Sequence, residues 1–127
     1  MTYFDIMWYP GAMKAVERVR EACCPQCGHT SHAEALDHEA VEAGGTLLAA
    51  LGDPIRLGII ELLSKHDRLC VCDIVEAFSV EQPTVSHHLR VLREADLVDV
   101  VRQGHWAYYG VRRDVLKRAA AHLVNLL

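Results

Sequence analysis

The sequence predicts a mainly α-helical domain that carries one β-hairpin, and two features of its patterning indicate this fold class. Most of the chain repeats apolar residues at spacings of three and four, which is typical of amphipathic helices. Residues 97–111 are instead rich in valine, tyrosine and tryptophan around Gln103-Gly104, which predicts a hairpin. A chain of 127 residues can bury one compact core.

The first part of the chain is predicted to hold two helices separated by a loop. An amphipathic helix is expected over 11–23, and Pro25 and Gly28 then break the pattern, which indicates a loop over 23–32. Helical spacing resumes over 33–51, where the Gly44-Gly45 pair is the expected weak point.

Asp53-Pro54 predicts the start of the next helix. An aspartate can accept from the free backbone N–H groups, and a proline at the first helical position has no N–H to leave unsatisfied. The buried stripe of this helix is expected to hold Ile55, Ile59, Leu62 and Leu63.

The second part of the chain predicts a compact series of short elements. A short helix over 72–78 and a turn over 79–81 precede a helix that has Pro83 in its first turn and runs to about Ala95, with Val85, Leu89 and Leu92 together on one face. After the hairpin, a helix over 114–127 closes the chain, with the apolar positions Val115, Leu116, Ala119, His122, Leu123 and Leu126. Helix, short helix, turn, helix, hairpin and helix is the order of a winged helix-turn-helix domain.

The charge of −4 is unevenly distributed. Residues 1–45 carry three basic and seven acidic side chains, whereas residues 82–118 carry seven basic and four acidic ones. A local basic face can attract DNA phosphates even on an acidic protein. The positive charge is therefore concentrated where a DNA-reading element is predicted.

Short polar and basic residues on the outer face of a helix can reach base edges and phosphates in the major groove. Taken one by one, these residues are better explained as a solvated helix face and a surface turn, but their order within this series of elements favours double-stranded DNA binding. The candidates are Gln82, Thr84, Ser86, His87 and Arg90 on the helix, and Arg102 and His105 beside the hairpin tip.

From Leu51 to Val111 the chain resembles the ArsR/SmtB family of metal-responsive transcriptional repressors, closest to its arsenite-responsive branch. The segments that carry the resemblance are ALGDPIRLGIIELL, CVCDIVEAF, QPTVSHHLRVLREADLV and QGHWAYYGV. The resemblance implies a winged-helix homodimer that binds an operator and leaves it when metal binds. Its dimer interface would use the helices around 12–19 and 115–127. The expected domains are an arm over 1–45, for dimerisation and metal ligands, and a DNA-binding domain with a dimerisation helix over 46–127.

Cys70 and Cys72 resemble the family's metal-binding motif, and chemistry supports this interpretation independently. Free N–H groups and the helix dipole stabilise a thiolate at a helix N-terminus, and the thiolate is the form that binds soft ions. Two thiolates are too few, since zinc usually takes four ligands and trivalent arsenic or antimony takes three sulfurs. Some relatives place a third cysteine where this chain has Val75, so we expect further ligands from Cys23, Cys24 and Cys27.

The inducing ion is expected to be As(III) or Sb(III), since the family segments resemble that branch most. Cd(II), Pb(II) or Zn(II) at a four-thiolate site is the alternative, because CPQCGH resembles a zinc knuckle. A thiol-redox-sensing repressor is a further alternative. Some relatives hold a second site in the last helix, but Leu116 and Asn125 stand where its ligands would be, so we expect none here.

An enzyme with a cysteine nucleophile is disfavoured, because no histidine or aspartate is spaced recognisably as a base. Five clustered cysteines favour metal chemistry in a reducing compartment over disulfides. The apolar stretches are far shorter than the roughly 20 residues of a membrane span, and 1–10 lacks the features of a signal peptide. We expect a cytoplasmic protein that does not contact membranes.

Overall fold

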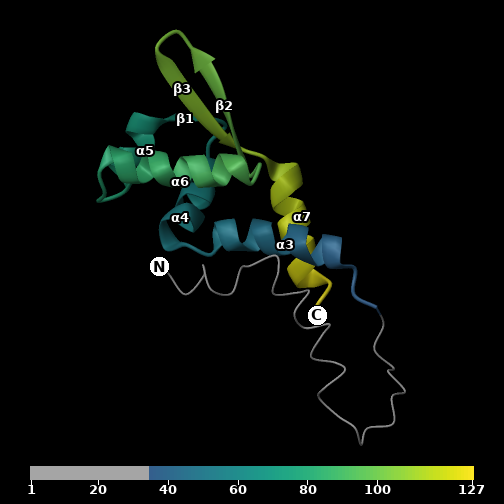
Figure 1. Ribbon diagram of the computed structural model, residues 1–127. Coiled ribbons are helices and arrows are strands. Elements are labelled where there is room, and N and C mark those ends of the chain that lie inside the picture. Colours follow the sequence, from purple (N-terminus) through teal and green to yellow (C-terminus); the bar gives the residue numbers. More distant parts are fainter. Residues whose placement is uncertain (1–34) are drawn as a thin grey trace, which may run out of the picture. The chain divides into compact units, whose positions relative to one another are not determined.

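The computed structural model describes residues 35–127, and within them Ala43–Leu127 forms one compact unit. These residues form five helices and three strands, and the fold is the predicted winged helix-turn-helix (Figure 1). In chain order they are α3 (His38–Leu51), α4 (Pro54–Ser64), β1 (Leu69–Cys70), α5 (Val71–Ala77), α6 (Gln82–Glu94), β2 (Val98–Gln103), β3 (Trp106–Val111) and α7 (Arg113–Val124). The predicted helix over 11–23 and loop over 23–32 lie outside the described residues.

The hairpin forms as predicted, and it belongs to a sheet that the sequence did not indicate. Strands β2 and β3 pair antiparallel from Val98↔Val111 to Gln103↔Trp106, and Gly104 turns the chain with a φ of 61°. A positive φ is accessible to glycine without steric cost. The predicted two-stranded hairpin is incomplete, because β1 adds a third strand against β3 in the order β1-β3-β2. Two residues are too few to show the alternation of a strand.

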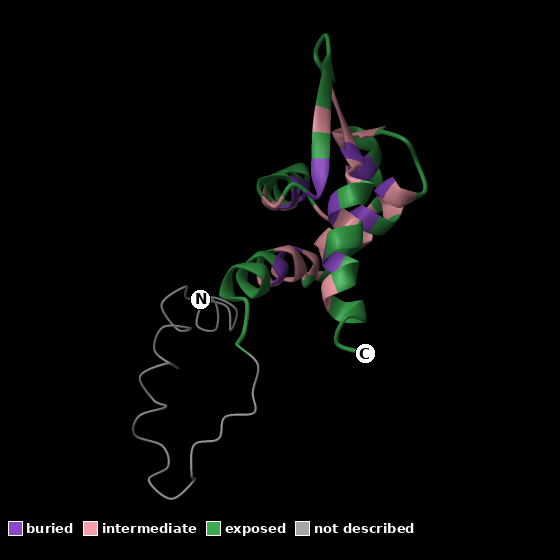
Figure 2. Cartoon of the chain, turned by 90° about the vertical axis from the view of Figure 1, so that its right-hand side faces the viewer, coloured by how far each residue is buried: buried purple, intermediate pink, exposed green. Residues whose placement is uncertain are grey.

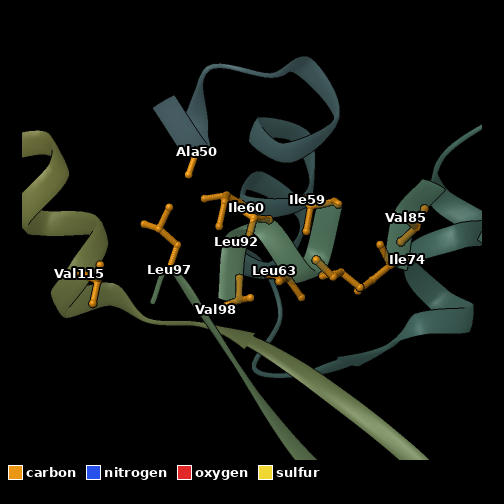
Figure 3. Close-up of a cluster of buried hydrophobic side chains, with 11 residues drawn as sticks. Ala50, Ile59, Ile60, Leu63, Ile74, Val85, Leu92, Leu97, Val98 and Val115 are labelled. Atoms are coloured by element: carbon orange, nitrogen blue, oxygen red, sulfur yellow. The ribbon is translucent and has the colours of Figure 1, made fainter. Parts of the chain in front are cut away.

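The core lies between α4, α5, α6 and the base of the sheet (Figure 3). Ile59 and Leu63 of α4 and Ile74 of α5 are fully buried against the inner face of α6. That inner face is the predicted stripe, and all three of its members are buried: Val85, Leu89 and Leu92. Helix α6 is therefore anchored by its apolar side, and its polar side faces outward.

The predicted start of α4 at Asp53-Pro54 is confirmed, but the predicted set of buried residues in this helix needs correction. Asp53 accepts from the N–H groups of Ile55 at 2.9 Å and Arg56 at 3.1 Å, and Pro54 takes the first position. Ile60 is buried instead of Ile55 and Leu62, which are only partly covered.

Three other helices differ from prediction at their ends or interiors. The helix expected over 33–51 begins at His38, and Asp37 accepts the Ala40 N–H in its first turn. Helix α3 continues without interruption through Gly44 and Gly45, the pair expected to be its weak point. A side chain at Gly44 would overlap the His122 ring, so this glycine allows α3 and α7 to approach closely. Helix α5 begins one residue earlier than predicted, and α7 ends at Val124.

Candidate DNA interface and cysteine pair

The outer face of α6 presents all five predicted DNA-contacting side chains to solvent. Gln82, Thr84, Ser86, His87 and Arg90 are exposed, while the opposite face is buried. Arg90 Nη2 lies 3.2 Å from His87 Nδ1, so these two side chains lie together one turn apart. The helix thus offers a polar, partly basic surface of the kind that enters a major groove.

His88, beside this face, points inward, and its contacts were not anticipated from the sequence. Its side chain is 12% exposed, and its Nδ1 lies 3.4 Å from Arg56 Nη1 and 3.9 Å from Asp53 Oδ1. Arg56 also donates from Nε to the Ala50 carbonyl at 2.6 Å and from Nη2 to the Ala49 carbonyl at 3.2 Å. Arg56 therefore contacts both the C-terminal end of α3 and helix α6. The signal was the i, i+3 spacing from Val85, which places His88 at the edge of the apolar stripe.

The titration of this cluster follows from its burial. Burial lowers the pKa of His88; the Asp53 carboxylate opposes the shift, and the positive charge of Arg56 adds to it. Burial alone would raise the pKa of Asp53, but the N–H groups of Arg56 and Ile55 outweigh it, so that pKa is lowered. A neutral His88 ring can accept from Arg56 at Nδ1, with its own proton on Nε2.

The wing carries the remaining predicted DNA contacts. Arg102 lies in β2 and His105 in the turn, and both side chains are exposed. Trp106 at the start of β3 is also exposed. The hairpin extends away from the helices of the compact unit (Figure 1).

Cys70 and Cys72 lie on either side of the junction between β1 and α5. Both are free thiols, Cys70 half-buried and Cys72 exposed. Asp73 accepts from the Cys70 backbone N–H at 3.3 Å and lies 3.1 Å from its sulfur. The hydrogen bond from the Cys70 thiol to this carboxylate raises the pKa of Cys70. The Asp73 carboxylate therefore disfavours the thiolate form of Cys70.

The cysteine pair is incomplete as a metal site within residues 35–127, where no three histidine, cysteine, aspartate or glutamate side chains converge to hold an ion. Cys23, Cys24 and Cys27 lie outside this range. Among the same residues, no helix has the length and apolar character needed to cross a membrane.

A recognition helix anchored by its apolar face, with a polar outer face and a flanking hairpin, defines a winged-helix DNA-binding protein. Residues 53–100 match the family model described as "Bacterial regulatory protein, arsR family". The chain is 38% identical over 79 residues to an uncharacterized HTH-type transcriptional regulator of Methanocaldococcus jannaschii, covering 62% of this chain and 89% of that one. It is 46% identical over 63 residues to the arsenical resistance operon repressor of Escherichia coli, covering 50% of this chain and 54% of that one.

The solved structure of NolR from Sinorhizobium fredii is similar, with a TM-score of 0.60, 29% identity, and coverage of 70% of this chain and 92% of that one. The chain belongs to the ArsR family of bacterial regulatory proteins. It is a DNA-binding transcriptional repressor of the ArsR/SmtB type and not an enzyme.

Proposed function

We propose that this protein is a homodimeric, metal-responsive repressor that binds operator DNA and leaves it when As(III) or Sb(III) binds its thiolates. The observation that carries the proposal is the position of the cysteine pair. Cys70 and Cys72 flank the start of α5, and Ile74 of the same helix packs into one core with Val85 of α6 (Figure 3). An ion held by these thiolates would act on the helix that supports the recognition helix.

The DNA contacts proposed are the seven exposed side chains predicted from the sequence. Those of α6 would enter the major groove, and Arg102 and His105 of the wing would reach the flanking backbone or minor groove. Arg56 and His88 would act as positioning residues, because they fix α6 without facing the DNA.

The ion site is completed in this proposal by Cys23, Cys24 or Cys27, reaching across from the second protomer. Trivalent arsenic takes three sulfurs, and the pair supplies two. The E. coli relative is named for arsenical resistance, which supports arsenite as the first ion to test, although the chain spans about half of that protein.

The dimer is supported by the exposed apolar end of α7. Leu123 near the end of α7 is 52% exposed and Leu126 just after it is 81% exposed, and residues 123–127 are all exposed (Figure 2). Apolar side chains grouped in this way are typical of surfaces that a partner covers. Sedimentation of the wild type and of Leu123→Glu, which places a charge on this surface, would test the dimer: we expect a dimer and a monomer respectively.

The proposed function is tested by fluorescence anisotropy of the reduced protein on its own promoter DNA, titrated with arsenite, antimonite, cadmium, lead and zinc. We expect arsenite or antimonite to weaken binding by about 100-fold, which is within the usual range of coupling between two sites. Cys70→Ser and Cys72→Ser should bind DNA as the wild type does but no longer respond. Single serine variants at 23, 24 and 27 identify the remaining ligands.

The other outcomes separate the alternatives. Release only by cadmium, lead or zinc would favour the four-thiolate site. Release by oxidation, with no response to any ion, would favour the thiol-redox repressor. A reduced protein that binds the promoter and responds to neither would contradict an inducer site at the cysteines.

A further inference from the structure

The cysteine pair is joined to the wing as well as to the recognition helix. Cys70 is the last residue of β1 and pairs with Tyr108 of β3, while Leu69 pairs with Tyr109. One of the two proposed metal ligands is therefore a backbone neighbour of a DNA-reading hairpin.

A salt bridge holds this strand against the wing. Arg68, directly before β1, donates from Nη1 to Asp99 Oδ1 at 2.9 Å and from Nη2 to Asp99 Oδ2 at 3.2 Å. Asp99 belongs to β2, so the side-chain bridge spans β3 and reaches the far strand of the sheet. Arg68 Nη1 also lies 3.4 Å from the Tyr108 carbonyl on β3. A bidentate arginine-carboxylate pair fixes direction as well as distance.

Gly110 shows that this approach is close. A Cβ atom at Gly110 would lie 3.1 Å from the Asp67 carbonyl oxygen and 3.3 Å from both Arg68 Nη1 and Asp99 Oδ1. The segment before β1 thus rests on the backbone of β3 at the one residue that has no side chain. The position of β1 and the direction of the wing are set together.

We propose that Arg68 and Asp99 are positioning residues that transmit ion binding at Cys70 to the wing, so that release from DNA requires movement of the wing as well as of α6. This inference rests on the proposed function. An ion that draws the Cys70 sulfur towards ligands outside β1 would pull on the β1–β3 pairing. Through the salt bridge, that pull would reach β2, which carries Arg102.

The test compares Arg68→Gln, Asp99→Asn and the double variant with Lys65→Gln as the matched control. Lys65, the residue that follows α4, also forms an exposed ion pair, at 2.8 Å, but its partner Glu61 belongs to α4 and not to the wing. Each protein is measured for arsenite binding by thiolate absorbance, for promoter affinity without arsenite, and for promoter affinity at saturating arsenite. The ratio of the two affinities is the coupling.

We expect the wild type and Lys65→Gln to lose about 100-fold in affinity on binding arsenite, and the other three variants to lose only about 40-fold with arsenite still bound, because an exposed ion pair contributes only about a twofold factor. The two single substitutions change net charge in opposite directions, so a loss of coupling shared by both cannot be a general effect of charge on DNA binding. The double variant should resemble each single one, because both remove the same bridge.

Two results would overturn the inference, and they are distinguishable. If arsenite binds and releases Arg68→Gln and Asp99→Asn as it releases the wild type, the wing transmits nothing and the proposed function stands. If the wild type binds neither arsenite nor cadmium, used as a second probe, the proposed function fails and this inference fails with it.

Discussion

The two DNA-reading elements of this domain are held in place by different physics. The recognition helix α6 is anchored by three buried aliphatic side chains and by the half-buried Arg56–His88 contact. Strand β2 of the wing reaches the same core through the buried Val98, but the β1 edge of the sheet is held by only two residues and by the Arg68–Asp99 pair, whose side chains are 38% and 47% exposed. Burial of one aliphatic side chain is worth about 1.5–3 kcal/mol, whereas an exposed ion pair is worth about 0–1 kcal/mol. The comparison teaches that the helix is the rigidly held DNA-reading element, whereas the β1 edge of the wing base is the part that a modest force can move.

The largest effect should come from the helix anchor. Leu89→Ala removes a side chain that is 1% exposed and leaves a cavity beneath α6, so we expect a loss of about 3 kcal/mol in the free energy of unfolding. Urea denaturation followed by circular dichroism measures it. Leu57→Ala on the exposed side of α4 is the control and should change stability much less. Equal losses in the two variants would mean that α6 is not anchored by burial.

A smaller loss is expected at the cap of α4. Asp53→Ala removes the acceptor for two backbone N–H groups and should cost about 1 kcal/mol. Asp53→Asn keeps an acceptor of the same shape and should recover most of that loss in the same denaturation experiment. Failure of the asparagine variant to recover stability would assign the role of Asp53 to its charge beside His88 instead of to capping.

The base of the wing should show the smallest loss of stability. Arg68→Gln breaks an exposed pair and should cost at most about 0.5 kcal/mol, although it is expected to change the coupling to arsenite. A loss as large as that of Leu89→Ala would remove the contrast between the two anchors.

The pH dependence of stability tests the Arg56–His88 contact of α6 without a substitution. Because the folded-state pKa of His88 is lowered, mainly by burial, the unfolded chain takes up a proton there before the folded chain does. Stability should therefore fall as the pH drops below the ordinary histidine value of about 6.5 towards the lower folded value. The lowered pKa of Asp53 acts only below about pH 4, so it does not contribute between pH 7.5 and 5.5.

Unfolding at pH 7.5 and 5.5 measures this effect, with His88→Gln and the exposed-residue control His66→Gln compared with the wild type. We expect His88→Gln to lose part of the pH dependence and His66→Gln to retain it. The opposite pattern would show that His88 is not the titrating group.

The features that hold α6 in place could be predicted from the sequence better than the features that hold the wing. Periodicity located the Val85, Leu89 and Leu92 stripe, and Asp53-Pro54 located the start of α4, because both signals are local. Strand β1 and the Arg68–Asp99 pair were missed, since they join residues 31 positions apart and leave no local pattern. His87 could be selected because it lies on the polar face of α6, which is a local signal. The contact of His88 with Arg56 could not be predicted, because these residues lie 32 positions apart.

The cysteine pair was found from its spacing, but its surroundings were not. Asp73 follows the pair in the segment CVCDIVEAF, but only the fold shows that its carboxylate accepts hydrogen bonds from the Cys70 N–H and thiol. The further ligands, the dimer and the DNA contacts remain predictions.

Amide hydrogen exchange with and without arsenite tests most directly whether the cysteine pair and the wing behave as one responsive unit beside a rigid recognition helix. We predict changed exchange in the segment covering β1 and α5 and in the strand β2, with little change in the buried half of α6, because α6 is expected to shift as a rigid body that keeps its own hydrogen bonds. Changed exchange in α6 together with an unaltered β2 would contradict the account, because the ion would then act through the helix alone.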